Sequence, residues 1–167
     1  MATKNIVPRA ADEGGLGTSA KNWGKVYTKQ RVMEVSSDAD GDHHGDVVYF
    51  GGTTSMTIGT IYQYVAASGG SWTPADADAA ATSQGLLGVA LGAASDTNGM
   101  LLRGFVTLDH DPGAIGDVLY LSTTAGDCSS VAPSGTGDVV RVIGYQVSHA
   151  SNGNIWFNPD STFVELT

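Results

Sequence analysis

The sequence predicts an all-β protein, and two observations carry this prediction. Its apolar residues gather in short segments rich in β-branched and aromatic residues, without the period of an amphipathic helix. Glycine, with 23 of the 167 residues, joins Asp, Asn and Pro in separating these segments, as tight turns require. About eight short antiparallel strands at this spacing favour a compact sandwich or barrel.

The expected strands follow one another through most of the chain. They cover residues 45–52, 56–66, 85–92, 99–108, 116–122, 137–148, 154–158 and 161–166. Turn signals lie between them, such as Asp-Pro-Gly at 111–113, where proline presets the backbone for a turn. One short helix is expected within 73–84, because Thr73 suits an N-cap, Pro74 the first turn and Asp76 the positive end of the helix dipole.

Charge divides the chain into two parts. Residues 1–31 hold six basic and two acidic residues, a net charge of +4, whereas residues 32–167 hold two arginines and fifteen acids, a net charge of −13. We therefore expect a basic, extended arm over 1–31 and an acidic β body over 32–167. The arm has too few large apolar residues to offset the entropy of ordering itself, so another surface must order it. Two kinds of surface fit this charge: another molecule, either an acidic protein or nucleic acid, and the acidic body of the same or a neighbouring chain.

Several features bear on where the protein acts. No apolar run approaches the roughly 18 residues of a membrane span, and the first residues lack the apolar centre of a signal peptide. The lone cysteine, Cys128, has no partner for an internal disulfide. The acidic body should repel nucleic acid and anionic membranes. We expect a soluble protein that is made in the cytoplasm.

The Asp38–Asp46 loop, DADGDHHGD, begins like a calcium loop, with aspartates at its first, third and fifth positions. The pattern then fails, because His43 stands where glycine is required and Tyr49 where the last acidic ligand is required. A solvated turn between arm and body is favoured, and a bound cation in this loop is left open.

Other chemical motifs are incomplete. His110, between Asp109 and Asp111, is expected as a polar loop tip, and the spacing from Gly17 to Gly24 is too long for a phosphate-binding loop. No nucleophile elbow occurs, and most carboxylates stand beside glycine in turns, where Asp suits the backbone. We therefore expect no enzyme, no catalytic residue, no cofactor and no metal ion.

Two phrases resemble parts of tailed-bacteriophage virion proteins. The phrase LGTSAKNWGKVYT resembles short segments of phage fibres and appendages that wrap a trimer or form attachment strands. The phrase GDVLYLSTTAGDCSSVAPSGTGDVVRVIGYQVS, followed by NIWFNPDSTFVEL, resembles β-rich modules of capsid-decoration, head-fibre and tail-fibre proteins. Together these phrases cover 59 of the 167 residues and contain no catalytic signature. The absence of repeats and heptads favours a compact decoration or adaptor protein over a long shaft.

The resemblance, with the charge pattern, implies a phage virion structural protein that is made in the host cytoplasm. We expect a homotrimeric capsid decoration (cement) protein whose arm binds the major capsid protein or another virion protein, with neither nucleic acid nor membrane as partner. The expected arm contacts are Arg9, Lys21, Trp23, Lys25, Val26, Tyr27, Lys29 and Arg31. The alternative is a tail or fibre adaptor or receptor-binding module in which Trp72, Tyr62 and Tyr64 stack on a glycan, although the same aromatics also suit the core.

Overall fold

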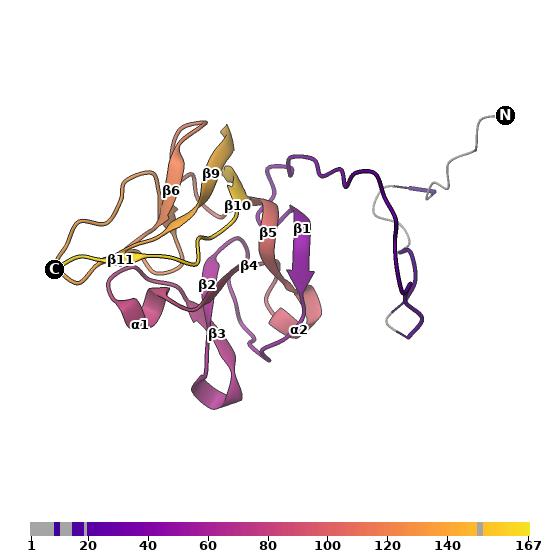
Figure 1. Cartoon of the computed structure of the whole chain (residues 1–167), viewed down its shortest axis with the longest axis horizontal. Helices are drawn as coiled ribbons and strands as arrows, with labels where there is room; N and C mark the ends of the chain where they lie inside the picture. The colour runs from indigo at the N-terminus through magenta and orange to yellow at the C-terminus, as the bar shows by residue number, and fades with distance from the viewer. Residues whose placement is uncertain (1–8, 11–14, 19, 150–151) are drawn as a thin grey trace. The chain divides into compact units, whose positions relative to one another are not determined.

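The computed structural model describes two units of the chain. The described residues are 9–10, 15–18, 20–149 and 152–167 (Figure 1). The units are Met1–Val32 and Met33–Thr167, and the second is called the body below. In the described residues of the first unit there is no helix and no extended strand pairing, only an isolated bridge between Thr18 and Lys21.

One curled antiparallel sheet of nine strands forms most of the body. Its strands are β1 (His43–Val48), β2 (Ile61–Val65), β3 (Ser71–Pro74), β4 (Leu86–Ala90), β5 (Met100–Thr107), β6 (Val118–Leu121), β7 (Cys128–Ser129), β9 (Val142–His149) and β10 (Gly153–Phe157). Their order is β3-β2-β4-β5-β10-β9-β6-β7, and β1 pairs with β5 (Figure 1). A small second sheet pairs β8 (Val139–Val140) with β11 (Val164–Glu165). The predicted all-β class is confirmed.

Local signals located most of the strands. Each of the eight predicted segments overlaps at least one strand, and segment 137–148 holds two, because Arg141 separates β8 from β9. The sequence missed β3 and β7. Strand β7 has two residues, and β3 ends at Pro74, a residue type that disfavours strands.

The predicted helix over 73–84 is wrong in its first half. Thr73 and Pro74 belong to β3, and Thr73 lies opposite Gln63 of β2. The helix that follows, α1 (Ala80–Ser83), has four residues and no side-chain cap. Pairing with β2 and burial of Trp72 outweigh the local helix signals of this segment.

The other short helices are η1 (Ala67–Gly69) and α2 (Ser95–Asn98). No helix in the described part of the chain is long and apolar enough to cross a membrane.

The main core lies on one face of the sheet. Val106 of β5 and Ile155 and Phe157 of β10 are completely buried in the largest apolar cluster. Trp156, between the last two, is half-buried and lies on the other face, because successive residues of a strand point to opposite sides. Each fully buried side chain of this size contributes about 1.5–3 kcal/mol relative to leaving it in water.

Strands β1 and β5 approach each other closely at Gly104. A Cβ atom there would collide with the carbonyl oxygen of His44, and the φ of Gly104 is +143°, a conformation that L side chains rarely adopt. Glycine at this position therefore allows β1 and β5 to pair closely, in the register that places His44 opposite Phe105.

Candidate functional site

The expected contact residues of the arm are all exposed to solvent. These residues are Arg9, Lys21, Trp23, Lys25, Val26, Tyr27, Lys29 and Arg31. The side chains of Trp23, Val26 and Tyr27 are 64%, 63% and 88% exposed. Their exposure means that the arm buries none of these large apolar side chains against itself. Residues 21–31 form one continuous described segment, whereas residues 11–14 and 19, between Arg9 and this segment, lie outside the described residues.

Cationic and aromatic side chains alternate with neutral ones in the arm. The first set is Lys21, Trp23, Lys25, Tyr27, Lys29 and Arg31, and the second is Asn22, Gly24, Val26, Thr28 and Gln30. In an extended strand, alternate residues point to opposite faces, so this segment would present one cationic and aromatic face. In the structure the arm bends at Gly24 and Lys29, so that face is interrupted at these two positions.

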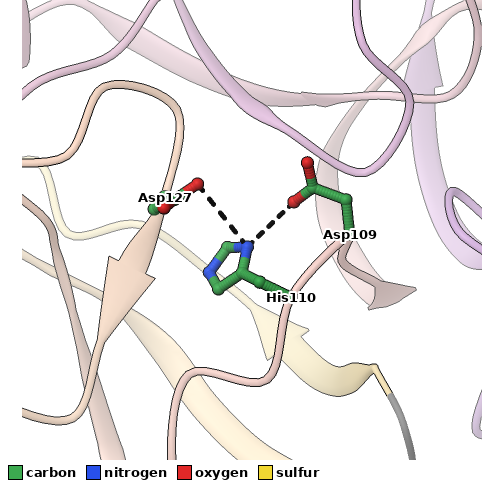
Figure 2. Close-up of side chains that lie close together, drawn as sticks. All are labelled: Asp109, His110 and Asp127. Carbon is green, nitrogen blue, oxygen red and sulfur yellow. Dashed lines mark hydrogen bonds and ion pairs between the residues drawn. The ribbon is translucent and has the colours of Figure 1, made fainter.

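A compact cluster of titratable side chains lies between the end of β5 and the start of β7 (Figure 2). Nδ1 of His110 lies 2.8 Å from Oδ1 of Asp109 and 3.7 Å from Oδ1 of Asp127. Their potential ligand atoms all lie within 4.8 Å of one another, and no second group of this kind occurs among the described residues. Sequence analysis recognised Asp109 and His110 as neighbours but missed Asp127, which only the pairing of β7 brings to the ring.

Both nitrogens of the His110 ring already have partners. Nε2 lies 3.2 Å from the amide nitrogen and 3.2 Å from the carbonyl oxygen of Cys128. In the neutral ring, Nε2 accepts a hydrogen bond from the Cys128 amide while Nδ1 donates one to Asp109; in the imidazolium, Nε2 donates to the carbonyl oxygen instead. A metal ion at Nδ1 would have to replace the hydrogen bond to Asp109. In either protonation state the ring therefore links the loop after β5 to the start of β7 by hydrogen bonds.

The carboxyl of Asp127 has an altered acidity. Burial raises its pKa, His110 opposes this effect, and the nearby carboxylate of Asp109 adds to it. Asp109 and Asp127 both lie near Nδ1 of His110, and Asp109 makes the shorter contact.

Cys128 forms a thiol–imidazole contact that sequence analysis did not find. Its Sγ lies 3.7 Å from Nε2 of His110. Burial raises the pKa of the thiol well above its ordinary value, and the carboxylates of Asp127 and Asp109 raise it further. Because the thiolate is the nucleophilic form and the residue is 4% exposed, Cys128 is placed as a small core residue rather than as a reactive one.

The carboxylates of the Asp38–Asp46 loop organise a turn. Asp42 accepts hydrogen bonds from the backbone N–H of Ser37, at 2.6 Å, and of His43, at 3.1 Å. The Ser37 hydroxyl is the largest cause lowering the pKa of Asp42, while burial opposes it. Asp40 accepts a hydrogen bond from the side-chain amide of Asn152. Within the described part of the chain, these carboxylates do not converge as a set of metal ligands.

The proposed glycan-stacking aromatics divide between core and surface. Trp72 and Tyr62 are buried, at 2% and 6% exposed, and Nε1 of Trp72 donates a hydrogen bond to the carbonyl oxygen of Phe50. Neither ring is therefore available as an open platform. Tyr64 is half-buried and borders an open hollow of about 590 Å³. The rest of the lining is Gly51, Gly52, Thr53, Gly69, Gly70, Ser71 and the edge of Trp72.

Comparison of the chain with models of known protein families, with curated proteins and with solved structures finds no match.

Proposed function

We propose that this chain is a structural protein of a tailed-bacteriophage particle, in which homotrimers clad the capsid and are attached to it by their arms. The observation that carries the proposal is the exposed arm. Trp23, Val26 and Tyr27 stand in solvent among four cations, in a segment without regular secondary structure. A segment of this kind gains its order from a partner.

The charge pattern supports an acidic protein surface as that partner. The arm supplies Trp23, Tyr27 and Arg31, residue types that often dominate the energetics of protein interfaces, and its lysines add positive charge. The body carries the opposite sign, with a net charge of −13 from residue 32 onward. This charge keeps bodies soluble at high local density and keeps nucleic acid at a distance. The major capsid protein, or another virion protein with exposed carboxylates, fits this description.

The β body supports a mechanical role. Its main sheet is continuous and well packed, and its buried thiol and fully engaged His110 ring give the proposal no catalytic step. The resemblance of LGTSAKNWGKVYT and of the C-terminal phrases to virion modules supports the same class. The proposal includes no cofactor and places the protein on the virion.

The second candidate is a tail or fibre adaptor or receptor-binding module. The hollow beside Tyr64 favours it, because the hollow is lined by four glycines, by Thr53 and Ser71 and by an aromatic ring, and small ligands bind in recesses that combine aromatic and polar groups. The two candidates differ in copy number. Capsid cladding requires hundreds of copies per particle and a tail or fibre role requires a few to tens, so quantitative mass spectrometry of purified virions separates them.

Attachment by the arm has a direct test. A chain lacking residues 2–31 should remain folded, by circular dichroism, and should no longer bind particles that lack this protein. The full chain, added to the same particles, is the control. If the shortened chain binds as tightly as the full chain, the contact lies in the body and the proposal fails.

A further inference from the structure

The side chains around His110 form a group that the proposed function does not use. Asp109 and His110 follow the end of β5, and Asp127 directly precedes β7, so two segments of the chain supply the group. Figure 2 shows the two carboxylates converging on the same ring nitrogen, Nδ1 of His110. Local sequence does not reveal this group, because Asp127 reaches the ring only through the pairing of β7 with β6.

The separations of the three potential ligand atoms suit a small cation. Oδ1 of Asp109 lies 2.8 Å and Oδ1 of Asp127 lies 3.7 Å from Nδ1 of His110, and the ligand atoms all lie within 4.8 Å of one another. Metal bonds near 2.1 Å place neighbouring ligand atoms of a tetrahedral site about 3.4 Å apart. The two contacts to Nδ1 bracket this value, so the carboxylates need only small side-chain movements to meet one ion.

Neighbouring groups already orient two of these ligands. Nε2 of His110 lies 3.2 Å from the carbonyl oxygen of Cys128, so a ring that binds an ion through Nδ1 can donate its Nε2–H to that oxygen. The hydroxyl of Thr60 donates a hydrogen bond to Oδ2 of Asp109, at 3.1 Å, and Oδ1 of the same carboxylate faces the ring. Metal-binding histidines and carboxylates are typically oriented by outer partners of these two kinds. The ion would take the position of the Nδ1 proton and replace its hydrogen bond to Asp109.

Charge and access also favour a cation. With a neutral ring, the group carries two negative charges side by side, which a divalent ion offsets. The side chains of His110, Asp109 and Asp127 are 23%, 28% and 35% exposed. An ion can therefore reach them from solvent, and water can complete its coordination.

The donor set indicates the class of ion. An imidazole nitrogen with carboxylate oxygens suits zinc and related divalent transition metals, whereas calcium and magnesium take oxygen ligands. The thiol of Cys128 lies outside this set, because its Sγ lies 3.7 Å from Nε2 of His110, the ring nitrogen that does not face the carboxylates.

We propose that Asp109, His110 and Asp127 bind one divalent transition-metal ion of the zinc class. Its ligands are Nδ1 of His110 and one carboxylate oxygen of each aspartate. The ion joins the loop after β5 to the start of β7, and this inference does not depend on the proposed role in a virion.

Calorimetric titration of the full chain with zinc chloride, after a chelator has removed bound metal, tests this site. The wild type should bind one zinc ion per chain. Asp127→Asn should bind it at least about tenfold more weakly, since loss of even an outer partner of a metal ligand costs that much. Asp127 makes only the longer contact to the ring, so this variant keeps the hydrogen bond between His110 and Asp109. Asp78→Asn, at an exposed aspartate outside the group, is the matched control and should bind zinc as the wild type does.

Two further variants complete the test. Asp109→Asn, which keeps an acceptor oxygen beside Nδ1, takes the place of Asp127→Asn if circular dichroism shows that the latter does not fold. The double variant His43→Gln, His44→Gln removes both imidazoles of β1, and it should bind zinc as the wild type does.

Each outcome supports or overturns the site. A wild-type chain that binds no zinc at millimolar concentration overturns the proposal. Equal affinities of the aspartate variant and Asp78→Asn do so as well. Loss of binding in the β1 double variant alone would place the ion at the Asp38–Asp46 loop instead. Attachment by the arm is measured separately, on particles, so its failure is distinguishable from each of these results.

Discussion

At the scale of single residues, Arg141 joins three separate segments of the body. Its guanidinium donates hydrogen bonds to the backbone carbonyl oxygens of Ser83, Gly85 and Asp160, and the side chain is 5% exposed. A hydrogen bond from a charged group contributes about 1.5–3 kcal/mol, and a buried acceptor that loses its donor retains its desolvation cost. Arg141→Met should therefore lower the free energy of unfolding by about 3 kcal/mol in urea titrations.

The control for this prediction is Lys25→Met, because Lys25 is exposed in the arm. An exposed substitution of this kind changes the free energy of unfolding by less than about 0.5 kcal/mol. Equal effects of the two variants would show that Arg141 contributes nothing through its carbonyl partners.

Asp42 gives the turn before β1 a defined pH dependence. Its pKa is lowered from 3.8, chiefly by the hydroxyl of Ser37. A carboxyl with a lower pKa in the folded state adds stability above its unfolded pKa, and this stability is lost as the pH falls through the folded pKa. Asp42→Asn should thus be least stable relative to wild type near neutral pH, and the difference should shrink below pH 3.8.

Urea unfolding of both proteins across this pH range measures the difference. Glu34→Gln, which changes an exposed carboxyl ahead of this loop, serves as the control. A gap between wild type and Asp42→Asn that stays constant with pH would contradict the role of the Ser37 hydrogen bonds.

At the scale of elements, the arm should bind as a strand with one dominant face. Trp23 and Tyr27 belong to the cationic and aromatic set, whereas Asn22 and Thr28 belong to the neutral set. Trp23→Ala should weaken attachment to particles by roughly 2 kcal/mol or more, the threshold of an interface hot spot. Tyr27→Ala should act in the same direction, and Asn22→Ala and Thr28→Ala should have little effect. A binding assay on particles without this protein measures all four.

Substitution of Val26 tests whether the partner buries one face of the arm or both faces. It is 63% exposed and lies on the neutral side of the alternation. Loss of affinity in Val26→Ala as large as in Trp23→Ala would mean that both faces of the strand are buried in the partner. Equal losses for every position from 21 to 31 would contradict a strand with one dominant face.

At the scale of the whole molecule, charge should control attachment. The arm and the body differ in sign, so binding of the arm to an acidic surface should weaken as salt rises, since exposed charges are screened beyond about 8 Å at physiological ionic strength. The apolar contacts of Trp23 and Tyr27, which lie on the dominant face, should leave a residual affinity at high salt.

The bound fraction on particles, titrated against salt concentration, tests this prediction. Decorated and undecorated particles are then compared under heat. Binding that is indifferent to salt contradicts the electrostatic part of the attachment. Decorated particles that are no more resistant than bare ones would favour the adaptor or receptor-binding candidate over cladding.

The sequence by itself determined the all-β class, the locations of most strands and the contrast of charge between arm and body. These properties reside in neighbouring residues: the alternation around Ile155 and Phe157, the glycines and aspartates of the turns, and the six cations among residues 1–31. Exposure of the arm also follows from its own sequence, because the segment has too few large apolar residues to form a core.

Tertiary structure alone decided which distant residues meet. Strand β3 forms because Trp72 pairs opposite Tyr64 of β2, which no local signal around Pro74 indicates. Asp127 reaches His110, and Trp156 lies between Phe105 and Tyr145, only through the order of strands in the sheet. Strand pairing joins segments far apart in the chain, and its free energy depends on both partners at once, so neither segment by itself encodes it.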